Sequence, residues 1–473
     1  MMNKHFLKAW PSKAGLLVLL AFAMGELQAQ TTHSFTAKQA ADYAQKNAIA
    51  VKNALIDIKI QEQTNRGVTS AAFPQLNGSV NVSYNPNIAV QSLPDFISPA
   101  TYQVLIDQGV KDGNGQPIAF PAGGFGNIAA QFGVPWTAGA GLELSQLLFD
   151  GQVFVGLQAR KTVLDFARKQ AEVTQESIKA NVYKVYYQLV VGRQQITSID
   201  ANIERFDKLL NDTREIFKQG FAEKLDVDKV QVQLNNLRTE KVKAINQLRV
   251  GDAGLKFLMN IPQRDSLILT DSLTEAELKD NVLDQQYNYN DRKEYQLLSL
   301  GLKLREFDVK RYQLSRIPTL AAFASYQKNA QRQKFDFFND GPWFTASLVG
   351  VKLNVPIFDG FARRSKIQSA KLEVEKSKNN LAQQQENIDN EVTASRLSMT
   401  SALQTIDAQR QNVELAEKVY NTTKLKYEQG LGNNQEIYNA QAELKVAQNN
   451  YYSALYDAIV AKVDYLKATG KLQ

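Results

Sequence analysis

The chain has 473 residues, 44% of them hydrophobic and 22% charged, and this composition excludes a disordered chain and a small disulfide scaffold. The absence of cysteine excludes disulfides, thiolate catalysis and cysteine-bound metals. The formal net charge is only +7 and the two histidines are His5 and His33, so the sequence indicates neither nucleic-acid binding nor histidine-based catalysis. We expect no cofactor and no metal site.

Residues 1–29 have the composition of an export signal. Three lysines precede an apolar run at 14–24, and Ala29 closes the segment. This is the order of regions in a secretory signal peptide, and the apolar run is short for the alternative, a membrane anchor. We expect cleavage after Ala29, which would remove Lys4, Lys8, Lys13 and Glu26 and lower the formal charge from +7 to +5.

The rest of the chain consists of two similar halves. The tetrapeptide at 148–151 (LFDG) recurs at 357–360 (IFDG), and the one at 217–220 (FKQG) recurs at 427–430 (YEQG). Each half runs from a helix through two alternating segments to a Phe-Asp-Gly motif and two long helices. This duplication predicts a first repeat at 30–260, an equatorial linker at 261–290 and a second repeat at 291–473.

The first helix of each half begins with a predicted capping box. Thr36 precedes Gln39 by three residues, and Asp291 precedes Glu294 by three residues. In a capping box these two side chains satisfy backbone N–H groups at the start of a helix. We therefore expect helices to begin directly after Thr36 and after Asp291.

Four segments alternate between apolar and polar residues with a period of two. They lie at 76–84, 136–145, 320–326 and 349–355, and the third is the least regular. Strands of about ten residues with one apolar face are typical of a transmembrane barrel, although a soluble sheet with one buried face gives the same pattern. The small, uncharged residues on the polar face of the first segment favour the barrel.

Aromatic residues also favour the barrel. They fall in the apolar phase, at the strand ends that flank a loop, and the loop at 85–135 is long and rich in proline and glycine. Aromatic side chains concentrate at membrane–water interfaces. The sequence therefore predicts an aromatic collar, formed by Tyr84, Trp136, Tyr326 and Trp343.

Four strands are too few to close a barrel. A spanning sheet has no free edge, because lipid offers no hydrogen bonds to unpaired backbone groups. Two copies would supply eight strands and three copies twelve. The chain is therefore expected to form an oligomer.

Two pairs of long helices carry coiled-coil seams. The 4-3 spacing of apolar or small residues runs through 178–217 and 388–427, and it returns through 227–258 and 437–468. Such a seam predicts supercoiled packing. A helix from residue 151 to residue 217 would be roughly 100 Å long. Gly220 and Gly430 follow the first helix of each pair, where a glycine commonly ends a helix.

In its export signal, its duplicated strand–helix–Gly–helix halves and its paired Phe-Asp-Gly motifs, the chain resembles the TolC-like outer-membrane efflux proteins over essentially all of its mature length. The resemblance implies a mixed α+β membrane protein with an internal duplication. It implies a homotrimer whose twelve-strand outer-membrane barrel continues into a long, periplasmic α-helical coiled-coil tunnel. It further implies a passive, non-enzymatic exit duct in contact with outer-membrane lipid, a periplasmic adaptor (membrane fusion protein) and an inner-membrane pump or exporter.

The resemblance also assigns positions at the second helix turn. Tyr427 matches an aromatic residue that holds the closed tip, and Glu436 matches the first of two acidic residues that constrict the tunnel. Asn439 stands at the second acidic position, and Gly432 at the position of a basic latch residue, so both features depart from the family pattern. An acid in the first turn of a helix also interacts favourably with the helix dipole, which is the alternative role for Glu436.

The helix turns are the places where the resemblance implies adaptor docking. The residues that mark them are Gly220, Asp226, Gly430 and Gly432. Asp226 carries the same ambiguity as Glu436, because it too lies in the first turn of a predicted helix. The alternative function is a periplasmic coiled-coil adaptor or scaffold, which would also use long hairpins but would not need aromatic residues in phase on apolar strand faces.

Overall fold

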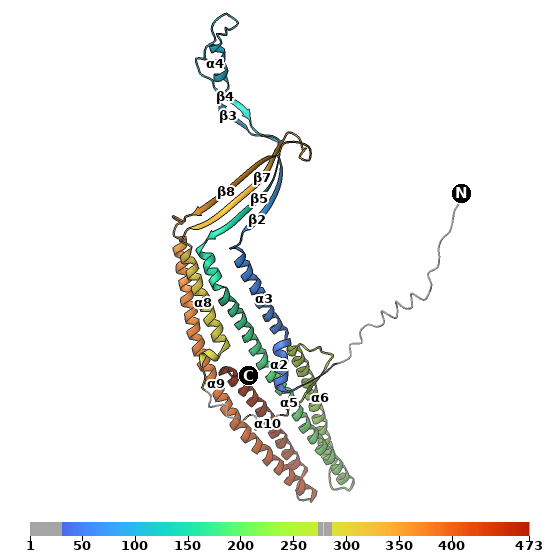
Figure 1. Cartoon of the computed structure of the whole chain (residues 1–473). Helices are drawn as coiled ribbons and strands as arrows, with labels where there is room; N and C mark the ends of the chain where they lie inside the picture. The colour runs from blue at the N-terminus through green and yellow to red at the C-terminus, as the bar shows by residue number, and fades with distance from the viewer. Residues whose placement is uncertain (1–30, 273–277, 279–285, 473) are drawn as a thin grey trace, which may run out of the picture. The chain divides into compact units, whose positions relative to one another are not determined.

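The computed structural model describes residues 31–272, 278 and 286–472, so the predicted signal peptide at 1–29 lies outside the described residues. The described chain forms two compact units, each assembled from stretches of both predicted repeats (Figure 1). One unit contains residues up to 62 together with 161–305 and 373–473, and the other contains 63–160 and 306–372. We refer to them as the helical unit and the sheet unit.

The sheet unit contains one antiparallel sheet of four strands in the order β2-β5-β7-β8. The strands are β2 (Gln75–Tyr84), β5 (Trp136–Phe149), β7 (Thr319–Arg332) and β8 (Phe344–Asn354). This confirms four strands per chain. The third strand is longer than its alternating segment suggested, because it continues six residues beyond Tyr326. The outer strands β2 and β8 each have one edge that this sheet leaves unpaired.

The register of the sheet brings the apolar phases of the strands onto one face. Leu76 of β2 lies opposite Leu144 of β5, which lies opposite Ala324 of β7, which in turn lies opposite Val349 of β8. Directly opposed residues of antiparallel strands point to the same side of a sheet. The neighbouring row, Asn77, Glu143, Ser325 and Leu348, therefore belongs to the other face, which is mainly polar.

The long loop between β2 and β5 folds into a small lobe of its own. It contains the antiparallel strands β3 (Val90–Pro94) and β4 (Asn127–Gln131) and the helix α4 (Ser98–Asp107). The backbone N–H of Asn85 donates to the carbonyl oxygen of Pro135, 2.7 Å away, so the lobe begins directly where the β2–β5 ladder ends. The sequence indicated a loop here and missed these three elements.

The four long helices are α5 (Gly151–Lys218), α6 (Lys224–Met259), α9 (Ala362–Glu428) and α10 (Asn434–Ala468). They confirm the predicted helix pairs. The seam of the first pair is tight enough to require glycine: a Cβ atom on Gly192 would lie 2.6 Å from Leu248 Cδ2, and one on Gly251 would lie 2.8 Å from Leu189 Cδ2. Leucine side chains of each helix thus fill the positions opposite glycines of the other.

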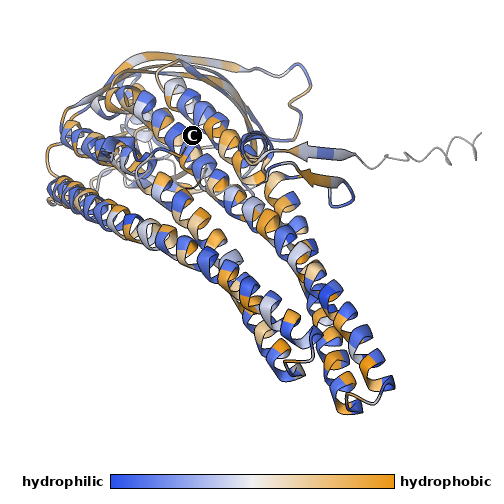
Figure 2. Cartoon of the chain, turned by 90° about the horizontal axis from the view of Figure 1, so that it is seen from below, coloured by the Kyte–Doolittle hydropathy of each residue, from blue (hydrophilic) through white to orange (hydrophobic). Residues whose placement is uncertain are grey.

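The helices are amphipathic along their length. In Figure 2, hydrophobic and hydrophilic residues alternate along them and give no continuous apolar stretch. Within the described residues, none of the helices combines the length and the hydrophobicity that crossing a membrane requires. Seam residues such as Val182, Phe206 and Leu444 are buried, as coiled-coil packing requires. Helix α5 also buries residues outside its seam, such as Tyr186 and Val190.

The N-terminal residues pair with a strand in the segment that was predicted as the linker, 261–290. Strand β1 (Thr32–Phe35) lies parallel to β6 (Ser266–Leu269), and the helices α2 (Ala37–Asn47) and α3 (Ile49–Ser70) follow β1. The capping box at Thr36 is confirmed: Thr36 Oγ1 accepts from Gln39 N at 3.2 Å, and Gln39 Oε1 accepts from Thr36 N at 3.0 Å. Apolar residues of β1, β6, α2, α5 and α6 share one core.

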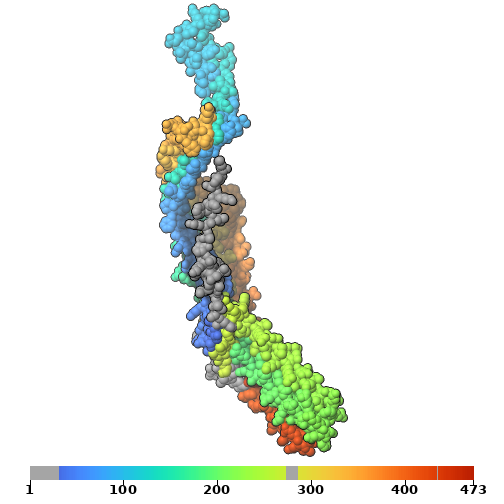
Figure 3. Space-filling model, turned by 90° about the vertical axis from the view of Figure 1, so that its right-hand side faces the viewer, coloured from blue at the N-terminus to red at the C-terminus, as the bar shows by residue number. Residues whose placement is uncertain are grey.

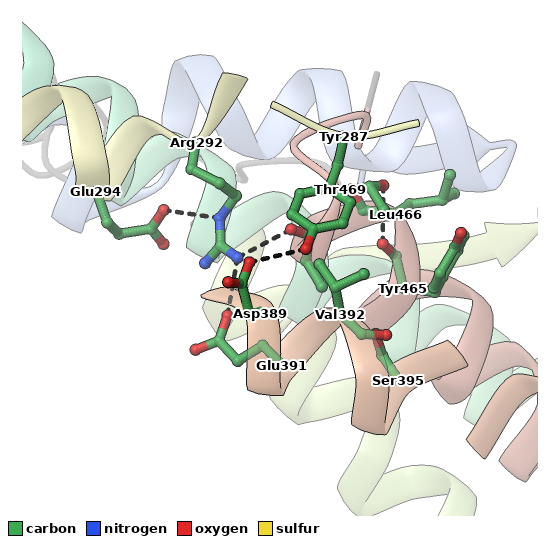
Figure 4. A network of polar contacts seen from close by, with 11 residues as sticks. Tyr287, Arg292, Glu294, Asp389, Glu391, Val392, Ser395, Tyr465, Leu466 and Thr469 are labelled. Atoms are coloured by element: carbon green, nitrogen blue, oxygen red, sulfur yellow. Dashed lines mark hydrogen bonds and ion pairs between the residues drawn. The ribbon is translucent and has the colours of Figure 1, made fainter. Parts of the chain in front are cut away.

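The start of the predicted second repeat contains a buried arginine. Arg292 lies between the 3-10 turn η1 (Tyr289–Asp291) and α8 (Lys293–Leu314), and its side chain pairs with Glu294 at 3.3 Å and with Glu391 of α9 at 2.8 Å (Figure 4). It also donates to the carbonyl oxygen of Ala468 at 3.0 Å. The capping-box prediction for Asp291 and Glu294 is wrong, because Arg292 holds the Glu294 carboxylate.

Candidate functional site

The apolar face of the sheet is exposed within the chain except near the loop end, where Phe337 packs over Ala138 and Ala330. Its most exposed large side chains belong to the two edge strands: Val80 of β2 is 81% exposed, and Val349 of β8 is 81% exposed. Soluble monomers rarely expose apolar patches on this scale. Two charged residues interrupt the face, Lys328 and Arg332 of β7, and the guanidinium of Arg332 pairs with Asp336 at 3.3 Å.

Two of the four predicted collar residues are in direct contact. Tyr84 and Trp136 lie opposite each other at the ends of β2 and β5, and their ring centroids are 4.6 Å apart. Trp343 immediately precedes β8 and packs against Phe337, with ring centroids 6.3 Å apart. These three residues lie near the loop ends of their strands, as predicted.

Tyr326 does not lie at a strand end. It stands opposite Leu142, six residues along β7 from Arg332, which is the partner of Trp136. The prediction of a strand end there is wrong because the polar residues after Tyr326 continue the ladder. Two residues of the loop after β7 pack near Trp136 instead. The ring centroids of Phe335 and Trp136 are 5.1 Å apart, and those of Phe337 and Phe335 are 5.5 Å apart.

Both helix turns are built around a left-handed glycine. Gly220 has φ 84° and Gly430 has φ 73°. In each turn the glycine N–H and the following N–H donate to the last carbonyls of the preceding helix, at 3.0 and 3.1 Å in the first turn and at 3.0 and 2.9 Å in the second. Each turn also exposes one large apolar side chain, Phe221 (84%) and Leu431 (78%).

The second turn leads into α10 through an asparagine cap. Asn433 Oδ1 accepts from the backbone N–H of Glu436 at 2.9 Å, and the Glu436 side chain is exposed. Asn439, one turn further on, accepts from Gln435 at 3.1 Å. Gly432 approaches the preceding helix closely, because a Cβ atom there would lie 3.3 Å from the backbone nitrogen of Tyr427.

An apolar cluster joins the two hairpins close to their turns. Tyr427 and Tyr438 pack on it half-buried, and its buried members come from all four long helices: Phe206, Leu209, Leu210, Val230, Leu234, Leu237, Tyr420, Ile437, Ala440 and Leu444. The hydroxyl of Tyr438 donates to the backbone carbonyl oxygen of Asp226, 3.1 Å away. The Asp226 carboxylate accepts from Glu223 N at 3.3 Å, so it also caps α6.

Sequence reasoning missed two residues of α10 that the structure places beside these positions. One is Tyr438, whose bond to α6 no local pattern reveals. The other is Glu443, which is exposed and follows Glu436 by seven residues, so that both lie on the same side of the helix about 10 Å apart. The i, i+7 spacing was the available signal for Glu443.

A groove of about 1110 Å³ runs between α9 and α10 in the helical unit. Small residues line much of it, among them Ala394, Ser398, Ala454 and Ala461. A groove with such short walls has the shape that receives a packed helix. Within the described residues, acidic and histidine side chains form no group of three or more that could hold a metal ion.

Known proteins share sequence similarity with this chain. The family model described as "Outer membrane efflux protein" matches residues 300–471. The chain is 22% identical to the outer membrane protein TolC of Vibrio cholerae, over 70% of this chain and 76% of that protein. It is 21% identical to the outer membrane efflux protein BepC of Brucella suis, over 94% of this chain and 88% of that protein.

The fold resembles that of solved outer membrane channels. The crystal structure of the CmeC outer membrane channel of Campylobacter jejuni matches with a TM-score of 0.68 and 16% sequence identity. The match covers 99% of this chain and 94% of that one. Long helices and a four-strand antiparallel sheet therefore reproduce a known architecture at low sequence identity.

Proposed function

The chain belongs to the TolC-like family of outer membrane efflux proteins, and from this we propose that three copies of it form the passive exit duct of an envelope-spanning efflux or secretion system. It is an outer membrane channel protein with a periplasmic helical extension, and its activity is transport rather than catalysis. The family implies a trimer that works together with an efflux system.

The observation that carries the proposal is the four-strand sheet with one apolar face and two unpaired edges. Strand β2 has no charged residue and β8 has only Lys352, so neither edge carries the charges that usually prevent edge pairing. Pairing β8 of one copy with β2 of the next satisfies both edges. Three copies then give twelve strands, with the apolar face toward lipid and the polar face toward the lumen.

The charged exceptions on the apolar face fit this arrangement. Asp336 neutralises Arg332 at the loop end of β7. The long aliphatic chain of Lys328 can extend along the sheet so that its ammonium reaches the interface. Around the loop ends, Tyr84, Trp136 and Trp343 form the aromatic collar of the membrane interface, with the exposed Phe335 as an additional member and the buried Phe337 packed beneath it. Tyr326 lies deeper in the lipid-facing surface.

The helix turns form the docking end of the duct. Gly220, Asp226, Gly430 and Gly432 shape the two turns, and these turns present Phe221 and Leu431 to a periplasmic adaptor. Exposed aromatic and aliphatic side chains are common anchors of protein interfaces. An inner-membrane pump or exporter then delivers the substrate to this end of the duct and supplies the energy for its export.

Near the same end, α10 constricts the tunnel. Three copies of Glu436 around a threefold axis form an acidic ring, with Tyr427 behind it in the apolar cluster and Asn439 one turn above. A second acidic ring at Glu443 lies about 10 Å further along the helix.

Mass measurement of the detergent-solubilised protein tests the proposed function. We expect a trimer that requires detergent and fractionates with the outer membrane. A folded monomer or dimer as the sole species would contradict the trimer. A water-soluble mature chain would instead support the other candidate, a periplasmic coiled-coil adaptor or scaffold.

A further inference from the structure

The lobe at 85–135 holds a cluster of three aromatic side chains, of which Tyr102 and Phe125 are half-buried and Phe120 is exposed. Tyr102 of α4 packs on Phe125 with ring centroids 5.1 Å apart, and Phe120 packs on Phe125 at 5.6 Å. Asp95 joins the strand β3 to α4, because its carboxylate accepts from Ile97 N at 3.1 Å and Ser98 N at 2.9 Å. Hydrogen bonds from the side chain and backbone of Ser98, with a smaller contribution from Ile97 N, lower the pKa of Asp95 and favour the carboxylate that joins the two elements.

The surface of the lobe is unusually apolar. Only four of its 51 residues are charged, a much smaller share than the 22% of the whole chain. They are Asp95, Asp107, Lys111 and Asp112. Seven large apolar side chains are exposed: Val90, Phe96, Ile97, Val104, Val110, Phe120 and Phe132. Figure 3 shows the lobe, in light blue and cyan, as an elongated projection at the top of the view. An apolar surface of this kind indicates a partner that covers it.

The dimensions of a twelve-strand barrel identify that partner. A compact body of 51 residues would have a radius of gyration of about 10 Å and would be about 25 Å wide. Twelve strands about 4.8 Å apart and tilted by about 40° enclose a barrel of about 12 Å radius, on which threefold-related points lie about 21 Å apart. Three bodies about 25 Å wide, anchored about 21 Å apart on such a rim, come into contact with one another.

We propose that the three lobes of the trimer pack against one another through their exposed apolar residues and form a cap over the outer opening of the barrel. This inference rests on the proposed function, because it requires the trimeric barrel. The occupant of the apolar surface is a second copy of this chain. The scarcity of charge fits this occupant, since residues close to a threefold axis meet their own copies, and a charge there would face two like charges.

The absence of cysteine in the chain permits a direct test. We would place single cysteines at Val104 and Phe132, and at Asn114 in the polar turn at 112–115 as a matched control. In the purified trimer, a short bismaleimide should link copies through Val104→Cys or Phe132→Cys, and a bulky maleimide should react with these variants more slowly than with Asn114→Cys. Equal reaction rates without cross-links between copies would overturn the proposal. Protection without cross-links would also overturn it and would indicate that lipid covers the surface.

A second measurement tests the cap itself. Ser83 lies on the polar face of β2, close to the loop end, so Ser83→Cys reports access to the lumen. In intact cells, a bulky external maleimide should label this cysteine slowly. Replacing residues 86–134 by a short Asn-Gly turn should accelerate labelling roughly tenfold, because labelling would no longer wait for the cap to open.

The mass of each preparation distinguishes a failure of the cap from a failure of the trimeric duct. A trimer whose Ser83→Cys labelling is equally fast with and without the lobe would overturn the cap and leave the exit duct in place. A monomer would overturn both.

Discussion

The hydroxyl of Tyr438 donates to the backbone carbonyl oxygen of Asp226, and this bond of 3.1 Å ties the start of α10 to the start of α6. Burial raises the pKa of Tyr438, with the charges of Asp226 and Tyr427 adding to the effect, so the tyrosine keeps its proton throughout the physiological range. The two helical hairpins of one chain are therefore joined by a polar contact at the end where they turn, next to the apolar cluster that they share.

Tyr438→Phe should loosen this junction. The substitution removes one half-buried hydrogen bond, worth about 1 kcal/mol, while the ring stays in place. We expect a higher closed-state conductance in planar bilayers and an unchanged trimer. Tyr456→Phe, at another half-buried tyrosine of α10, is the control. A closed-state conductance equal to that of the unsubstituted protein would mean that Tyr438 does not hold the constriction.

The acidic rings should bind multivalent cations. Three confined carboxylates attract a trivalent cation that can bridge them. Glu436→Gln should weaken cation block of the conductance, and the double substitution Glu436→Gln with Glu443→Gln should abolish it. Because Asn439 replaces the acid nearest to Glu436, the block should be weaker than in relatives with acids at both positions.

Single-channel recording across a series of trivalent-cation concentrations measures this block. Glu414→Gln, at an exposed carboxylate of α9, is the control and should leave the block unchanged. If Glu436→Gln alters neither closed conductance nor block, Glu436 serves only to stabilise the start of α10, and the constriction lies elsewhere.

Glycine is required at both helix turns. A Cβ atom in the left-handed region costs about 1 kcal/mol or more, so Gly220→Val and Gly430→Val should distort the turns at φ 84° and φ 73°. We expect transport in a complemented strain to fall while trimer assembly stays intact. Gly254→Val, in a helical position with open space around it, is the control. Normal transport by both turn variants would show that adaptor docking does not depend on these turns.

The two faces of β8 should respond differently to a charge. Val349 lies in the apolar row with Leu76, Leu144 and Ala324, whereas its neighbour Leu348 lies in the polar row and is 58% exposed. Val349→Lys should cost roughly 2–4 kcal/mol in the bilayer midplane, and Leu348→Lys should cost little. The yield of assembled trimer in outer-membrane fractions measures this. Equal yields would contradict the assignment of the apolar face to lipid.

The sequence predicted the parts of the fold that repeat regularly. The seams of α5 and α9 recur every 3.5 residues over many turns, and β2 alternates along its whole length, so local pattern and burial agree. The second half of β7 was missed because its apolar phase contains Lys328 and Arg332, whose charges mask the alternation.

The residues that sequence reasoning missed at the candidate site depend on contacts between distant segments. Phe335 and Phe337 reach Trp136 from a loop nearly 200 residues away, and Tyr438 reaches a backbone atom of α6. No local period encodes a contact of this kind. The same holds for Arg292, whose partners lie on α9 and at the end of α10.

A buried carboxyl group near Arg292 should give the helical unit a pH-dependent stability. Burial raises the pKa of Glu176, and the nearby charge of Glu294 raises it further. The pKa of Glu176 is therefore higher in the folded protein than in the unfolded chain. As the pH rises from the unfolded pKa through the folded pKa, the unfolded state loses its proton first, and the folded state loses stability relative to it. Glu176→Gln should therefore raise the melting temperature at neutral pH and leave it unchanged near about pH 3, where the carboxyl is neutral in both states.

Circular dichroism of the solubilised protein across pH measures the effect. Glu172, one turn away, is a control of opposite sign: burial opposes its ionisation, but Lys169 at 2.5 Å and Lys293 at 3.4 Å outweigh burial and lower its pKa. Glu172→Gln should therefore lower the melting temperature at neutral pH. A Glu176→Gln variant less stable than the unsubstituted protein at neutral pH would refute the prediction.

The parallel pairing of β1 with β6 also constrains the order in which the chain can fold. Thr32 lies opposite Ser266, so more than two hundred residues separate β1 from its partner strand β6 along the chain. During export from the N-terminus, β1 therefore reaches the periplasm well before β6. The hairpin of α5 and α6 closes between residues near in sequence and can form earlier, since local contacts are made first. During that interval the edge of β1 is unpaired and open to wrong partners. A periplasmic chaperone that shields extended segments would therefore have its greatest effect on the N-terminal strand, before the second repeat has been exported.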